Sequence, residues 1–236
     1  MKALVFHGPG QTAWQDVPDP SIKDAADAIV RVNAVTICGT DLHIIKGDVP
    51  EVTPGRVWGH EAVGTAVETG SDVRTFRPGD RVLISCISSC GRCRFCREGH
   101  YGQCRGGGGR VLGHTIDGTQ TEYVRVPFAD LSMHPLPSAV DSHDAVLLAD
   151  IFPTSYEVGI TTGLVDTHST PMLLRMMAAG RHHASALVTH RFERGQMKEA
   201  YDVFARAGDT GALKVVLGSP RHDVVAEAAQ REVERT

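Results

Sequence analysis

The chain has 236 residues, of which 42% are hydrophobic and 22% are charged. This composition is typical of a globular protein and argues against a disordered or fibrous one. Its 24 basic side chains are outnumbered by 28 acidic ones, for a net charge of −4, so nothing favours non-specific binding of nucleic acid. No stretch approaches the roughly 20 apolar residues of a membrane span, and the apolar run at the N-terminus is too short for a signal peptide. We therefore expect a cytoplasmic protein without a nucleic-acid or membrane partner.

The first half of the chain predicts short β-strands. Apolar or alternating stretches, many of them bounded by Gly or Pro, favour strands, and they occur at residues 2–6, 28–35, 62–69, 81–85 and 121–126. Possible metal ligands lie between these strands: Cys38 follows the second strand, and the pair His60-Glu61 precedes the third. Residues of these types are usually structural when they occur singly, and spacing alone does not bring them together.

Five of the six cysteines lie between residues 86 and 104. Four of them form the run C-x2-C-x2-C-x7-C, made of Cys90, Cys93, Cys96 and Cys104. One short loop with this spacing can place four thiolates around a tetrahedral structural zinc. An iron–sulfur cluster is the alternative, although its bacterial spacing continues with x3-C-P. We interpret residues 86–105 as a zinc lobe, Cys86 as a buried small apolar residue, and Gly106–Gly109 as a flexible loop beside the lobe.

The second half of the chain predicts helices. Asp141 or Ser142 can cap a helix that leads through an apolar run to Asp150. A second helix is expected to begin at Thr170-Pro171 and to end at Gly180. Apolar residues spaced by three and four indicate a third helix, which is followed by a strand; these are residues 197–204 and 213–217. The tail, residues 220–236, has the pattern of an amphipathic helix.

Together these motifs resemble the zinc-containing alcohol dehydrogenases of the medium-chain dehydrogenase/reductase superfamily. The resemblance rests on the segments around Cys38 and Asp150, on the four-cysteine lobe, and on Gly59-His60-Glu61-x2-Gly64-x5-Gly70-x2-Val73. It implies a mainly β fold with α (α+β): a GroES-like catalytic domain with a zinc-binding lobe, plus a remnant strand and helix of a Rossmann domain. The implied divisions are 1–159 for the catalytic domain, 160–186 for the remnant of the nucleotide-binding domain, 187–218 for the returning helix and strand of the catalytic domain, and 219–236 for the tail.

The resemblance also implies two Zn²⁺ ions per chain. The structural ion would be held by the four-cysteine lobe. The catalytic ion would be held by Cys38, His60 and Asp150, and Glu61 occupies the family position that can coordinate the metal or swing away from it. The substrate implied is a small alcohol or aldehyde.

Three further roles follow from the resemblance. Thr40 and His43 match the hydroxyl and the imidazole that pass the proton of the alcohol to solvent. Thr154 matches a position close to the nicotinamide ring of the cofactor.

The chain departs from the family in its cofactor-binding part. Relatives that transfer hydride carry a dinucleotide-binding domain at this point of the chain, with the fingerprint G-x-G-x-x-G after its first strand. No glycine pair here has a third glycine at the required position. After Val158 the chain passes to residues 160–167, which resemble the last strand of that domain. NAD(P) binding, expected of the family, is therefore doubtful.

A lone strand from such a domain would expose a sheet edge, which favours self-association. The apolar face of the helix would also need cover, either by folding back on the catalytic domain or by pairing with a second subunit, so we expect a homo-oligomer formed through the exposed strand and helix as one possibility. The favoured hypothesis is an alcohol dehydrogenase homologue with both zinc sites and little or no dehydrogenase turnover alone. Three alternatives are redox chemistry with a cofactor supplied by a partner chain, a zinc-hydroxide hydrolase or hydratase, and a non-catalytic zinc-binding interaction protein.

Overall fold

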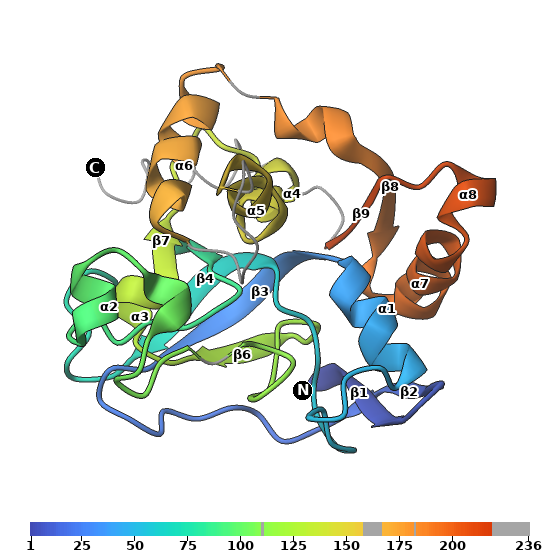
Figure 1. Cartoon of the computed structure of the whole chain (residues 1–236), viewed down its shortest axis with the longest axis horizontal. Helices are drawn as coiled ribbons and strands as arrows, with labels where there is room; N and C mark the ends of the chain where they lie inside the picture. Colours follow the sequence, from blue (N-terminus) through green and yellow to red (C-terminus); the bar gives the residue numbers. More distant parts are fainter. Residues whose placement is uncertain (110, 158–166, 182, 219–236) are drawn as a thin grey trace, which may run out of the picture.

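A seven-stranded sheet forms the centre of the molecule. The computed structural model describes residues 1–109, 111–157, 167–181 and 183–218. The strands follow the order β7-β5-β4-β3-β9-β8, and β6 also pairs with β3 (Figure 1). Their bounds are β3 (Ala28–Thr36), β4 (Ala62–Thr69), β5 (Arg81–Ile84), β6 (Tyr123–Val126), β7 (Met133–Pro135), β8 (Val188–Glu193) and β9 (Lys214–Gly218). A separate hairpin is made of β1 (Lys2–Gly8) and β2 (Gln11–Asp16).

The five strands predicted from the first half of the chain are confirmed as β1, β3, β4, β5 and β6. Strand β2 was not predicted, because its sequence QTAWQD is mostly polar and its side chains are exposed or half-buried. It is fixed by antiparallel pairing with β1, in which Leu4 lies opposite Trp14.

The returning segment of the chain completes the central sheet. Strand β9 pairs antiparallel with β3, with Val35 opposite Leu217, and parallel with β8. Between β8 and β9 lie η5 (Arg194–Gln196), α7 (Met197–Ala205) and α8 (Ala207–Thr210). The predicted third helix is thus confirmed as α7, and the predicted strand 213–217 as β9.

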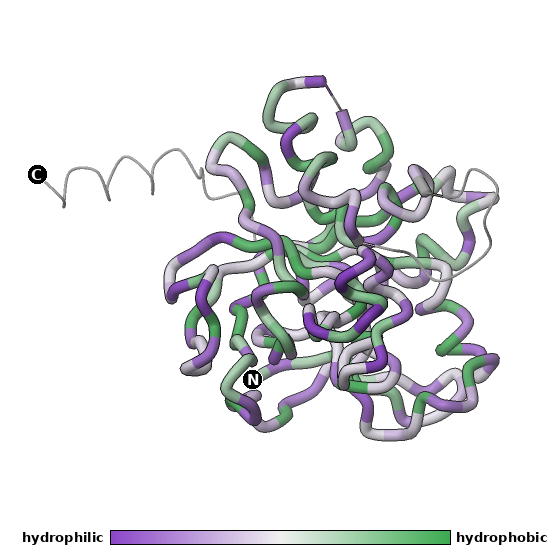
Figure 2. Tube along the Cα trace, turned by 60° about the vertical axis from the view of Figure 1, so that its left-hand side comes forward, coloured by the Kyte–Doolittle hydropathy of each residue, from purple (hydrophilic) through white to green (hydrophobic). Residues whose placement is uncertain are grey.

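Two hydrophobic clusters cover opposite faces of the sheet. Side chains alternate between the faces of a strand, and in β9 Val215 and Leu217 belong to the first cluster whereas Val216 belongs to the second. Helix α7 contributes to the first cluster, and η2 (Val146–Leu148) and α6 (Thr170–Ala178) to the second. Figure 2 shows hydrophobic segments in the interior and hydrophilic ones prevailing in the outer loops.

The remaining short elements lie in the loops and crossovers. They are α1 (Gly39–Lys46), α2 (Arg94–Arg97), η1 (Tyr101–Gln103), α3 (Ala129–Ser132), α4 (Ser142–Ala145), α5 (Ile151–Glu157), η3 (Thr167–Ser169) and η4 (Ala184–Leu187). Asp141 caps α4 as expected, since its carboxylate accepts a hydrogen bond from the backbone N–H of His143 at 2.8 Å. No helix in the described ranges is both long and apolar enough to cross a membrane.

Helix α6 corresponds to the expected remnant helix, but its apolar face is not exposed. Leu173 and Leu174 are buried against the second cluster, and Met172 and Met177 pack around them. Of the two covers that we expected for this face, the structure shows the first: it folds back on the catalytic domain. Residues 160–166 of the expected remnant strand and the tail from residue 219 lie outside the described residues, so a homo-oligomer remains a prediction.

Candidate metal centres

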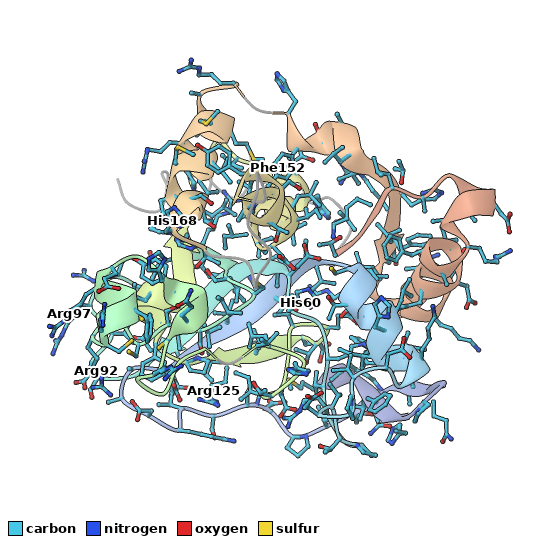
Figure 3. The ribbon with its side chains drawn as sticks, viewed as in Figure 1. His60, Arg92, Arg97, Arg125, Phe152 and His168 are labelled. Atoms are coloured by element: carbon cyan, nitrogen blue, oxygen red, sulfur yellow. The ribbon has the colours of Figure 1, made fainter. Side chains whose placement is uncertain are left out.

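Three loops bring Cys38, His60 and Asp150 together. Cys38 follows β3 and is the N-cap of α1, whereas His60 immediately precedes Glu61 and β4. Because Val35 of β3 lies opposite Ala62 of β4, the antiparallel pairing places these two loops side by side. Asp150 directly precedes α5. One ligand atom from each residue lies within 4.8 Å of the other two, so the predicted trio converges in space; His60 is labelled in Figure 3.

Two carboxylates hold the His60 ring. Its Nε2 lies 3.2 Å from Oδ2 of Asp150, and its Nδ1 lies 3.6 Å from Oδ1 of the fully buried Asp41. Burial alone would disfavour the imidazolium ion, but the negative charge of Asp41 and the hydrogen bond that the ring donates to Asp150 outweigh it and raise the pKa of His60 well above its ordinary value. Asp41 also accepts a hydrogen bond from the Cys38 backbone N–H at 2.9 Å. One carboxylate therefore supports two of the three candidate ligands.

Thr154 orients the third candidate ligand. Its hydroxyl donates a 2.7 Å hydrogen bond to Oδ1 of Asp150, which leaves Oδ2 facing His60. Burial would raise the pKa of Asp150, but the hydrogen bonds from His60 and Thr154 lower it below its usual value. The expected place of Thr154 beside a nicotinamide stays a prediction, and its observed contact is with Asp150.

Glu61 lies beside this trio but outside it. Its fully buried carboxylate accepts hydrogen bonds from Nζ of Lys214, at 2.9 Å to Oε2 and 3.3 Å to Oε1. Burial would lower the pKa of Lys214, but the charge of Glu61 more than offsets this and raises it. The structure thus shows Glu61 in an ion pair, and the expectation that it coordinates the metal stays a prediction.

Thr40 and His43 both lie on α1, and both are exposed. The hydroxyl of Thr40 is 3.8 Å from Sγ of Cys38. The ring of His43 is further along the helix, where its Nδ1 lies 2.9 Å from Oδ2 of Asp48. The proton path from Thr40 through His43 to solvent stays a prediction.

The four lobe cysteines form the second candidate centre. Their Sγ atoms all lie within 4.8 Å of one another, and the separation is 4.0 Å for Cys90–Cys96 and for Cys93–Cys104. Four sulfurs at about 2.3 Å from a tetrahedral zinc would be roughly 3.8 Å apart, so the lobe fits that ion. None of these thiols is in a disulfide.

The lobe favours the thiolate form at Cys93 but not at Cys96. Hydrogen bonds from the backbone N–H groups of Cys96 and Arg105 lower the pKa of Cys93 to about 6, whereas burial raises the pKa of Cys96 to about 12. A bound zinc ion would deprotonate both. Arg92 and Arg97 are exposed on the lobe and project outward in Figure 3.

The glycines that follow the lobe pack against its sulfurs. A Cβ atom on Gly106 would collide with Sγ of Cys90, and one on Gly108 would lie 2.8 Å from Sγ of Cys104. At Gly106 and Gly108 a side chain would therefore not fit against the lobe, and the flexibility that we expected of this loop stays a prediction.

Comparison with known proteins agrees with this arrangement. Residues 24–138 match the family described as the alcohol dehydrogenase GroES-like domain. Zinc-type alcohol dehydrogenase B of Aspergillus flavus is 42% identical over 156 residues, which cover 66% of this chain and 36% of that protein. Glutathione-independent formaldehyde dehydrogenase of Pseudomonas aeruginosa is 38% identical over 184 residues, which cover 69% and 45%. The structure of zinc dependent alcohol dehydrogenase 2 from Streptococcus pneumoniae superposes with a TM-score of 0.86 at 27% identity, over 94% of this chain and 99% of that chain.

The chain belongs to the zinc-type alcohol dehydrogenase family. The fold expected from the resemblance, a mainly β GroES-like domain, is confirmed. The matched residues span less than half the length of the two curated relatives named above.

Two supporting residues of this family member were not predicted from the sequence. Asp41 stands three residues after Cys38, the spacing at which a side chain reaches back to the N-cap of a helix, and this spacing could have indicated it. Lys214 is the one charged residue in the strand sequence KVVLG. A lysine in an otherwise apolar strand indicates a buried partner, but the partner, Glu61, is 153 residues away.

Proposed function

We propose that this chain binds two zinc ions and is an alcohol or aldehyde oxidoreductase homologue with little or no dehydrogenase turnover alone. The observation that carries the proposal is the convergence of Cys38, His60 and Asp150. A thiolate, an imidazole and a carboxylate are ligands that catalytic zinc accepts, and three protein ligands leave a position for substrate. The relatives named above, an alcohol dehydrogenase and a formaldehyde dehydrogenase, support alcohols or aldehydes as the substrate class.

The residues around the proposed catalytic zinc have different roles, some orienting the metal ligands and others carrying the proton. When bound, zinc supplies a Lewis acid that lowers the pKa of an alcohol. Asp41 and Thr154 fix the orientation of His60 and Asp150, because partners of this kind keep metal ligands in place. Thr40 holds the hydroxyl proton near the site, and His43, oriented by Asp48, moves it to solvent.

Dehydrogenase activity also needs a bound nicotinamide dinucleotide as the hydride acceptor. The described residues include one parallel strand pair with a helical crossover, from β8 through α7 to β9. The turn after β8 is Glu193-Arg194-Gly195-Gln196, which lacks the glycine pattern that cradles a pyrophosphate. These residues do not fit a dinucleotide, and we assign no hydride-transfer step to them.

Metal analysis combined with nucleotide titration tests the proposal. We expect close to two zinc ions per purified chain, and no change in NADH or NADPH fluorescence on titration with the protein. A content of one zinc ion per chain would contradict one of the two proposed metal centres. Tight nucleotide binding would contradict the proposed loss of turnover.

Activity assays separate the remaining possibilities. Ester hydrolysis or CO₂ hydration that disappears in Cys38→Ser would replace the proposal with zinc-hydroxide chemistry. Alcohol oxidation that appears only when a second protein supplies the nucleotide would show a cofactor held by a partner chain.

A further inference from the structure

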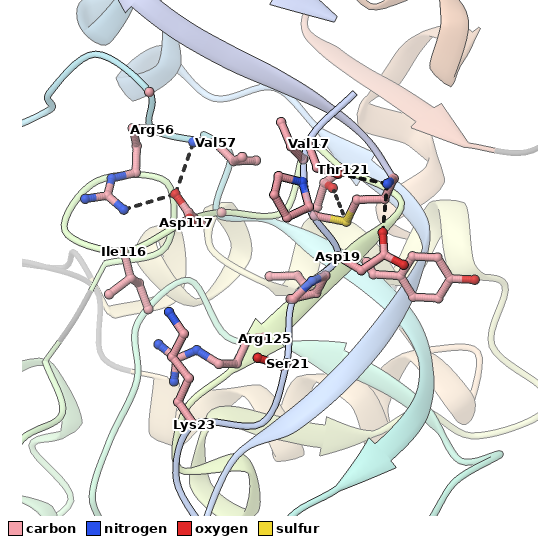
Figure 4. Close-up of a pocket in the computed structure, with 17 residues that line it drawn as sticks. Val17, Asp19, Ser21, Lys23, Arg56, Val57, Ile116, Asp117, Thr121 and Arg125 are labelled. Carbon is pink, nitrogen blue, oxygen red and sulfur yellow. Dashed lines mark hydrogen bonds and ion pairs between the residues drawn. The ribbon is translucent and has the colours of Figure 1, made fainter. Parts of the chain in front are cut away.

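A cavity lies away from both candidate metal centres. It measures about 390 Å³ and is lined by Met1 and by residues of four segments: 17–23, 55–57, 116–118 and 121–125. None of the candidate metal ligands lines it. Its size falls within the range of small-molecule sites, about 300–1,000 Å³. Figure 4 shows the side chains around it.

The walls of this cavity are partly apolar. Val17, Val57, Ile116 and Val124 contribute aliphatic side chains, as do two prolines of the 17–23 segment. An apolar wall with a few polar groups is the usual composition of a site for a small organic ligand.

Its charged groups leave one positive charge without a partner. The N-terminal ammonium pairs with Asp19 at 2.7 Å, and Arg56 pairs with Asp117 at 3.0 Å. Arg125 pairs with the buried Asp27, also at 3.0 Å. Lys23 is exposed and makes no ion pair with any residue in the described ranges. A cavity whose other charges are balanced therefore favours a ligand with a single negative charge.

Lys23 and Arg125 both line the cavity, and both bind one carboxylate oxygen: Oδ2 of Asp27 accepts hydrogen bonds from the backbone N–H of Lys23 and from Nη1 of Arg125, each at 3.0 Å. In Figure 4 the nitrogen atoms of Lys23 and Arg125 lie toward the same end, near Ile116. Nη1 of Arg125 donates its hydrogen bond to Asp27, and the other N–H groups of the guanidinium can donate to a ligand. An ammonium and a guanidinium that line one cavity can both donate charge-assisted hydrogen bonds to a bound carboxylate.

We propose that this cavity binds a small organic monocarboxylate, whose anionic group contacts Lys23 and Arg125 and whose apolar part contacts Val17, Val57 and Ile116. The site is independent of the proposed zinc chemistry. Lys23 is the one cation of the cavity without an ion-pair partner among the described residues, so a ligand with two negative charges, such as a phosphate monoester, would bring one charge that no cation offsets.

Titration with 4-fluorobenzoate, followed by ¹⁹F NMR at neutral pH, tests this site. We expect saturable binding to the full-length chain that is weakened about tenfold or more in Lys23→Met, since this variant keeps the alkyl stem and loses one charge-assisted contact. Lys23→Arg should retain binding. Lys198→Met, an exposed lysine on α7, is the matched control and should bind as the unaltered protein does.

Two further arms distinguish this cavity from the zinc centre and from a general anion site. Because carboxylates also bind zinc, the titration is repeated with Cys38→Ser; unchanged binding supports the cavity, and lost binding would overturn it. Inorganic phosphate should not displace the probe at equal concentration. Equal binding by Lys23→Met with unchanged circular dichroism, displacement by phosphate, or no saturation up to about 20 mM probe would each overturn the proposal.

Discussion

Lys214 and Glu61 form a buried ion pair, with Nζ 2.9 Å from Oε2. The side chains are 7% and 0% exposed, and Nζ also donates to the backbone carbonyl of Ile37 at 3.0 Å. Through these contacts β9, the last described strand, holds both the residue before Cys38 and the residue after His60. The returning segment therefore supports the candidate catalytic centre as well as closing the sheet.

Removing one partner of this pair should be costly. Lys214→Met leaves the Glu61 carboxylate buried without a counter-charge, and loss of one partner of a buried pair costs about 3–5 kcal/mol. Urea denaturation measures this loss. The double variant Lys214→Met/Glu61→Gln should be less destabilised than Lys214→Met alone, because it removes the uncompensated charge. If the losses in unfolding free energy of Lys214→Met and Glu61→Gln simply add in the double variant, the two side chains do not interact.

The two candidate centres should respond differently to loss of one sulfur. Cys93→Ser is expected to unfold the lobe, lower the zinc content to about one ion per chain and cause aggregation, because binding of the ion by all four thiolates is coupled to folding of the segment that carries them. Cys38→Ser should also bind about one zinc ion but should stay folded. Zinc analysis together with thermal denaturation distinguishes these outcomes. Equal destabilisation by both variants would argue against one structural and one catalytic site.

The hydrogen bond from Thr154 to Asp150 should strengthen metal binding. Thr154→Val removes this bond while keeping the shape of the side chain, and loss of a partner of a metal ligand typically weakens affinity about 10–100-fold. Competition with a zinc chelator measures the change. Ser155→Ala is the control, because Ser155 donates to the carbonyl of Ile151. If Thr154→Val binds zinc as tightly as the control, Thr154 does not position the ligand.

A methyl group on Gly108 should disturb the zinc lobe. In Gly108→Ala the new Cβ would lie 2.8 Å from Sγ of Cys104 and 2.9 Å from the backbone N of Cys90, closer than such atoms approach without movement. We expect the lobe to lose zinc more readily in chelator titrations. Gly195→Ala is the control, since nothing lies within 4 Å of a Cβ there. Equal zinc retention by both variants would show that the loop yields without effect on the sulfurs.

The buried histidine of β7 should make stability depend on pH. His134 lies 3.0 Å from the hydroxyl of Ser85, and burial lowers its pKa from 6.5 to about 4. Between these values the unfolded chain binds a proton that the folded chain does not, so stability falls as the pH drops from 6.5 toward 4. A shift of this size corresponds to roughly 3 kcal/mol at most.

Replacing this histidine tests that dependence. His134→Gln should show a shallower loss of stability between about pH 6.5 and 4.5 in urea denaturation than the unaltered protein, since the side chain no longer titrates. The exposed His7→Gln should keep the original slope. Parallel slopes for all three proteins would exclude His134 as the cause.

The local parts of this protein follow from its sequence. Four cysteines within 15 positions predict the lobe, because so short a loop has few ways to arrange its thiolates other than around one ion. Apolar alternation predicts strands such as β3, and the polar N-cap Asp141 predicts the start of α4, because these signals depend only on neighbouring residues.

The candidate catalytic centre depends on contacts that local pattern cannot specify. Family resemblance grouped Cys38, His60 and Asp150, but the supporting pairs Asp41–His60 and Lys214–Glu61 appear only in the folded chain. They exist because β3 pairs with both β4 and β9, so the register of the sheet brings distant segments to one place. The covering of α6 has the same origin: its apolar pattern predicts that it must be buried, and only tertiary packing decides against which surface.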